Sequence, residues 1–138
     1  MDFSSSQFST EWLRRADTVA RAVHLWVRRQ ALVRLCAGKE ISAESQRGYI
    51  GGLIEGLSDS MGLTEQEHQM VAYAYCLLSG ADKDTLLATR ELLDVRIDPS
   101  VGSSYVEGLS AAQSLYAGVR RTMTNDSIAA GRQSTRAI

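Results

Sequence analysis

Proline, cysteine and aromatic residues are scarce in this sequence: one proline, two cysteines and 7% aromatics among 138 residues. The single proline, Pro99, and the lack of sustained alternation between apolar and polar residues argue against a β-sheet. No run of about 18 uncharged apolar residues occurs, so the sequence predicts no membrane span. The beginning, MDFSSSQ, lacks the basic start and apolar core of an export signal peptide. We expect a cytoplasmic protein; the serine-rich start is also compatible with secretion into a host cell.

The two cysteines are too few for a structural zinc site. Cys36 and Cys76 both lie in apolar helical contexts, where a thiol behaves as a small hydrophobic group. We expect buried, reduced thiols, with a disulfide between helices or a reactive thiol as the alternatives. The sequence also contains no recognisable nucleophile motif and no phosphate-binding glycine loop. It therefore predicts no catalytic residues and no cofactor, although catalytic groups can converge from distant positions.

Charge is spread unevenly along the chain, although the net charge is only -1. Residues 1–40 carry seven Lys or Arg against four Asp or Glu, residues 41–98 four against ten, and residues 99–138 four against two. The net charges of these segments are +3, -6 and +2. This polarity could steer a charged partner, or the two ends could fold against the acidic middle.

Helical periodicity dominates the chain and predicts an all-α fold, a single-domain bundle of about five helices. We expect helices at about 10–37, 42–61 and 64–79, a short helix beginning after a cap at Asp82 or Asp84, and a helix at about 103–123. Ser42 and the pair Thr64 and Glu67 are typical N-terminal caps. The third helix is apolar all round, so we expect it to be central. The bundle would span residues 10–123, between flexible ends at 1–9 and 124–138.

Glycine recurs every four residues in the second predicted helix, at Gly48, Gly52 and Gly56, with Gly51 alongside. Each glycine inside a helix costs about 1 kcal/mol relative to alanine, so a compensating interaction is needed. The fifth helix carries small residues at the same interval. We predict a helix-packing groove in which the glycines contact either another copy of their own helix or the second small-residue stripe, Ser104, Gly108 and Ala112.

Five arginines occupy the polar side of the first predicted helix: Arg14, Arg15, Arg21, Arg28 and Arg29. They are the candidate partner-binding residues. Such a face can be merely solvated, can bind an acidic protein or the acidic middle of this chain, or can neutralise phosphates of a nucleic acid. A nucleic acid is the less favoured partner, because the net charge is not positive.

His68 directly follows Glu67 and lies close to Glu65 in the sequence, with Asp82 and Asp84 further on, and so is a candidate metal ligand. Glutamates two positions apart on a helix point in different directions, so only one of them could share a site with His68. Acidic residues at a helix N-terminus are also favoured by the helix dipole alone. We therefore predict no metal site.

The segments AGKEISAE at 37–44 and MGLTEQE at 61–67 resemble the helix-boundary pattern of TerB-like tellurite-resistance domains. The resemblance covers about 45 residues and consists largely of capping chemistry, which unrelated helical bundles share. It implies a helical regulatory or scaffold module. The family pattern has an aspartate before the glycine where this chain has Ala37, a departure that bears on the family's metal site.

The function expected from the sequence is a non-enzymatic protein–protein interaction module, an adaptor or regulator that could form a homodimer. The alternative is a nucleic-acid-binding accessory protein that uses the arginine face. A third hypothesis is a metal-binding TerB-like sensor or a secreted effector.

Overall fold

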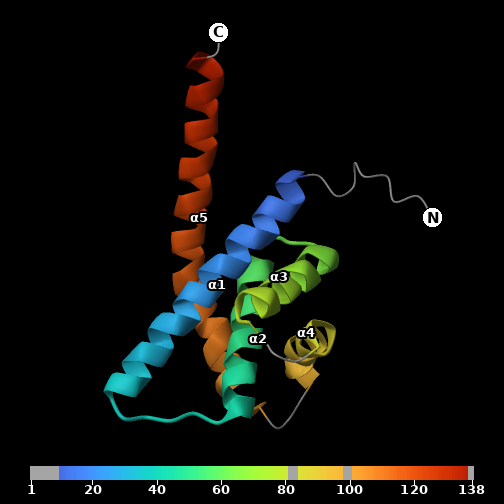
Figure 1. Ribbon diagram of the computed structural model, residues 1–138, viewed down its shortest axis with the longest axis vertical. Helices are drawn as coiled ribbons and strands as arrows, with labels where there is room; N and C mark the ends of the chain where they lie inside the picture. Colours follow the sequence, from blue (N-terminus) through green and yellow to red (C-terminus); the bar gives the residue numbers. More distant parts are fainter. Residues whose placement is uncertain (1–9, 81–83, 98–100, 137–138) are drawn as a thin grey trace, which may run out of the picture.

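Five α-helices and one short 3₁₀ helix make up the fold, which is all-α over the residues described (Figure 1). The computed structural model describes residues 10–80, 84–97 and 101–136, with side chains from Leu13 to Arg121 within these ranges. The helices are α1 (Thr10–Cys36), α2 (Ala43–Ser60), α3 (Glu65–Leu78), α4 (Thr85–Leu93), η2 (Asp94–Ile97) and α5 (Ser104–Arg136). The expected all-α bundle is confirmed.

Local capping chemistry fixes the helix boundaries close to where the sequence places them. The hydroxyl of Ser42 accepts a hydrogen bond from the backbone N–H of Ser45 at 3.1 Å, at the start of α2. Thr64 and Glu67 form a capping box at the start of α3, and Asp84 caps α4. Gly38, Gly62 and Gly80 follow α1, α2 and α3 with φ between 65° and 67°, a backbone conformation that ends helices.

α2, and not α3, is the central helix, so that expectation is wrong. α2 contacts α1, α3, α4, η2 and α5. Half of its 18 residues are buried, among them Leu53, Ile54 and Leu57. α3 buries one face, with Val71 and Ala72, and leaves Leu77 exposed. The physical reason is that glycines, rather than bulky apolar side chains, allow neighbouring helices to approach α2 closely.

α5 continues to Arg136, 13 residues beyond the end expected at Met123. This added length contains alanine, glutamine and arginine, which favour helix, and no proline interrupts it. Its lack of apolar periodicity matches its position, because the last part of α5 extends past the other helices in Figure 1. The proposed flexible N-terminal segment 1–9, Asp82 and Pro99 lie outside the described residues.

Candidate interaction surface

The two small-residue stripes meet within the chain. A Cβ atom added to Gly52 would lie 3.1 Å from the Cα of Gly108 and 3.0 Å from the backbone N of Leu109. One added to Gly56 would lie 2.8 Å from the Cβ of Ala112, and one added to Gly48 would overlap the Ser104 hydroxyl. The structure therefore brings all six residues of the predicted groove together, and α5 fills the groove along α2.

The five candidate arginines divide into two groups. Arg15 reaches the carboxylate of Glu67 at 3.5 Å, and Arg21 binds Asp17 at 2.8 Å. Glu67 is 5% exposed and one of its oxygens has no other partner, so the pair with Arg15 belongs to the packing of α1 on α3. Arg14, Arg28 and Arg29 are exposed and form no ion pair with a described residue. The arginine face thus partly serves the chain's own acidic middle.

The second half of α1 leaves the helical body. Val27 is the last buried residue of this helix, and no residue from 28 to 36 is buried. In Figure 1 this light-blue end of α1 extends beyond the other helices before the chain returns to α2. Cys36, which the sequence analysis expects to be buried, is exposed for this reason. Cys76 is buried in α3, and both thiols are free.

Exposed apolar side chains cover this end of α1. Leu25 is 50% exposed, Leu32 60%, Val33 63% and Leu35 75%. Leu25 and Leu32 are seven positions apart and share the outward side of the helix. Together these four residues, with Arg28 and Arg29 between them, are called the α1 surface below. Three of these residues stand in the apolar run ALVRLC at 31–36, but the run itself does not show whether a neighbouring helix covers it.

Polar contacts hold the α1 surface in place from behind. The indole Nε1 of Trp26 donates a hydrogen bond to the hydroxyl of Tyr49 on α2 at 2.8 Å. Arg34 donates to the side-chain oxygen of Gln46 at 3.0 Å, and its guanidinium lies 5.6 Å from the centre of the Tyr49 ring. These contacts orient the last turns of α1, so the exposed apolar side chains belong to an anchored helix.

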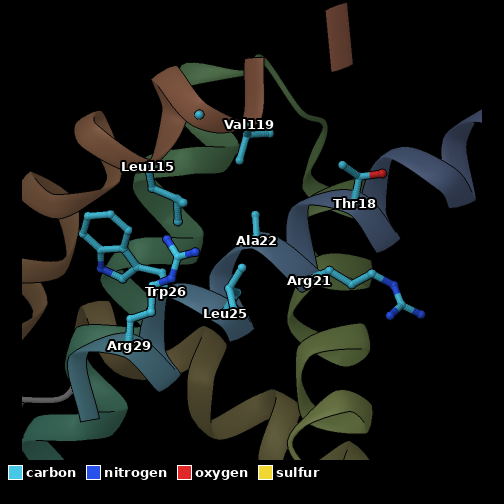
Figure 2. Close-up of a pocket in the computed structure, with 9 residues that line it drawn as sticks. Thr18, Arg21, Ala22, Leu25, Trp26, Arg29, Leu115 and Val119 are labelled. Carbon is cyan, nitrogen blue, oxygen red and sulfur yellow. The ribbon is translucent and has the colours of Figure 1, made fainter. Parts of the chain in front are cut away.

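A cleft of about 500 Å³ lies between α1 and α5, beside the α1 surface (Figure 2). Its apolar walls are formed by Ala22, Leu25 and Trp26 of α1 and by Leu115 and Val119 of α5. In Figure 2 the side chain of Arg29 extends toward α5 on the side of α1 that carries Trp26, whereas Arg21 extends the opposite way. Leu25 belongs to both the cleft and the α1 surface, so one apolar region continues from one to the other.

Gly118 also lines the cleft, and it differs from the glycines between α2 and α5. A Cβ atom added to Gly118 would meet nothing within 4 Å, so no described side chain requires a glycine at this position. The α5 wall of the cleft therefore carries the side chains of Leu115 and Val119, with no side chain at position 118. The small-residue spacing of α5 is visible in the sequence, but this opening is not.

His68 lies in a different environment from the one that its sequence neighbours suggested. Its Nε2 atom is 3.6 Å from a carboxylate oxygen of Glu55 on α2, and Glu55 also faces Arg96 at 3.5 Å. Burial, with a further contribution from Glu55, raises the pKa of nearby Tyr105. No set of three or more His, Cys, Asp or Glu side chains within the described ranges is arranged to hold a metal ion. This cluster therefore links α2, α3 and η2.

Three comparisons place these findings against known proteins. The chain gives no match to protein-family models, to curated proteins or to solved structures. The TerB-like resemblance thus stays a prediction. In the part of the chain that the structure describes, no helix has both the length and the apolar character needed to cross a bilayer. What supports a function is therefore the geometry of the α1 surface and of the adjoining cleft.

Proposed function

We propose that this chain is a non-enzymatic protein-interaction module that binds a partner protein through the α1 surface. The observation that carries the proposal is the exposure of Leu25, Leu32, Val33 and Leu35 on a helix end whose outer side no described residue covers. Contiguous apolar patches on soluble proteins mark interaction sites, whereas scattered apolar residues do not. An apolar centre edged by arginine is also the usual composition of an interface.

The anchoring of α1 supports the same function. Trp26 and Arg34 fix the helix against α2, so its outer side chains are oriented before a partner binds. A preorganised surface loses less conformational entropy on binding than a loop of the same composition. The neighbouring cleft adds depth to an otherwise convex helix, as the sites of binding anchors require.

Charge favours a different protein over a second copy of this chain. Residues 25–35, which include the α1 surface, contain three arginines and no aspartate or glutamate. A symmetric pairing of two α1 surfaces would therefore bring like charges together without a compensating acid, which disfavours association. The homodimer suggested by the sequence would thus need another face of the molecule.

Selection from a displayed library of random peptides tests this function. We expect peptides enriched on the wild-type protein to lose at least about tenfold in affinity for Leu32→Asp, because the change places a charge at the centre of the apolar contact. Leu86→Asp is the matched control, since Leu86 on α4 is 69% exposed and Leu32 is 60% exposed. Circular dichroism would check that both variants fold. Equal affinity for the two variants would contradict the proposal.

A further inference from the structure

The cleft between α1 and α5 indicates the shape of the partner segment that could bind there. Between Ala22 and Leu32 the apolar region follows α1 for about 15 Å, the length of nearly three helical turns. The cleft lies beside α5, where Gly118 carries no side chain. A cleft that continues onto an exposed apolar helix face suits an amphipathic helix whose anchors recur at spacings of three, four and seven residues.

The charged residues beside the cleft indicate the sign of the partner's charge. Arg29 lines the cleft and Arg28 lies on the opposite edge of the α1 surface, and neither forms an ion pair with a described residue. Arg21 is already bound to Asp17. Acidic side chains on either edge of a bound helix would therefore meet two arginines that have no described acidic partner.

We propose that the cleft receives an acidic amphipathic helix of a partner protein, whose apolar side chains lie against Ala22, Trp26 and Gly118 and whose carboxylates pair with Arg28 and Arg29. The inference rests on the proposed function and specifies the partner of the same surface. Gly118 is the position where the largest apolar anchor of the partner enters. This accounts for a glycine inside α5 at a position where an added Cβ atom would meet nothing within 4 Å.

Three helical peptides of about 18 residues test the inference by fluorescence anisotropy, with leucine at the same spacings and Glu, Gln or Lys at the flanking positions. We expect the Glu peptide to bind at least about tenfold more tightly than the Lys peptide at low salt. The preference should shrink as salt screens the arginines. Arg29→Gln should weaken the Glu peptide about three- to tenfold and leave the Gln peptide nearly unchanged. Equal binding of the Glu and Lys peptides would overturn the inference.

Gly118→Leu tests the position of the bound helix. Because a Cβ atom there meets nothing within 4 Å, the variant should fold, and its side chain should block the cleft. We expect at least about a tenfold loss of Glu-peptide affinity. Gln113→Leu is the matched control, because Gln113 is exposed on α5 and lies on the side away from Gly118. Leu25→Glu is a second blocking variant that leaves α5 unchanged. Wild-type affinity in both blocking variants would overturn the cleft as the binding site.

Two further results separate this inference from the proposed function. If the Glu peptide does not bind while library peptides still distinguish Leu32→Asp from Leu86→Asp, only the inference fails. Vesicles of phosphatidylserine and phosphatidylcholine provide the other arm. Sedimentation of the protein with these vesicles, unaffected by the Glu peptide and abolished by Leu32→Asp, would assign the α1 surface to an anionic membrane and overturn both proposals.

Discussion

The α2–α5 contact and the α1–α5 cleft use the same kind of residue in opposite ways. Between α2 and α5, Gly52 and Gly108 face each other so closely that a Cβ atom on either would collide with the other helix. Across the cleft, Gly118 faces open space. The absence of a side chain therefore allows close packing between α2 and α5, whereas between α1 and α5 it leaves a cleft. Small-residue spacing predicts that two helices could approach each other closely. The positions of the other helices in the fold decide whether they do.

The largest effect is expected from replacing a glycine in the contact between α2 and α5. In Gly52→Leu the new side chain would meet the backbone of Tyr105 and Leu109, which cannot move without shifting α5. We expect the free energy of unfolding to fall by about 3 kcal/mol or more, far beyond the gain in helix propensity. Thermal melting followed by circular dichroism would measure it. A variant as stable as the parent would show that α2 and α5 are not in tight contact.

Thiol labelling compares the body of the fold with the extended end of α1. Cys36 is exposed at the end of α1, whereas Cys76 is buried and its burial raises the pKa of the thiol. An aromatic disulfide reagent reacts with the thiolate, so we expect Cys36 to react at least about 100-fold faster than Cys76 at neutral pH. Single-cysteine variants, Cys36→Ser and Cys76→Ala, assign the two phases. Similar rates would mean that α3 opens readily or that the end of α1 is covered.

Two arginines of α1 are expected to differ in their contribution to the free energy of unfolding. Arg15 neutralises the buried carboxylate of Glu67, so Arg15→Ala should lower the free energy of unfolding by about 1–2 kcal/mol. Arg28 forms no ion pair with a described residue, and Arg28→Ala should stay within about 0.5 kcal/mol of the parent. Urea denaturation at fixed pH would measure both. Equal effects would place Arg28 in the fold instead of on a binding surface.

Much of the fold follows from local chemistry that the sequence displays. The caps at Ser42 and Thr64 depend on residues within a few positions of each other, and the structure places them as expected. The alignment of Gly48, Gly52 and Gly56 with the stripe on α5 also follows from matched spacing. Periodicity could not show that α1 extends beyond the other helices, because an apolar run has the same sequence pattern whether or not a neighbouring helix covers it.

The candidate site was therefore only half visible in the sequence. Its arginines were identified, but the division between Arg15, which binds Glu67, and Arg29, which lines the cleft, depends on which helix lies opposite each turn of α1. The apolar half of the site was missed, since residue type alone does not distinguish exposed residues such as Leu32 and Leu35 from core residues. Long-range arrangement, and not residue type, distinguishes an anchor of the core from an anchor for a partner.

The smallest effect is expected at Gly118, and it directly tests whether the cleft between α1 and α5 is open. Gly118→Ala adds a methyl group where nothing lies within 4 Å and removes a helix-destabilising glycine. We expect a gain of about 0.5–1 kcal/mol in the free energy of unfolding, the reverse of the change expected at Gly52. Gly108→Ala is the matched control in the same helix, where the added methyl would collide with the backbone of Tyr49 on α2 and destabilise the protein. Calorimetry on the two variants would compare them. A loss of stability in Gly118→Ala would mean that another part of this chain fills the cleft, and the α5 wall of the cleft would then belong to the fold and not to a partner.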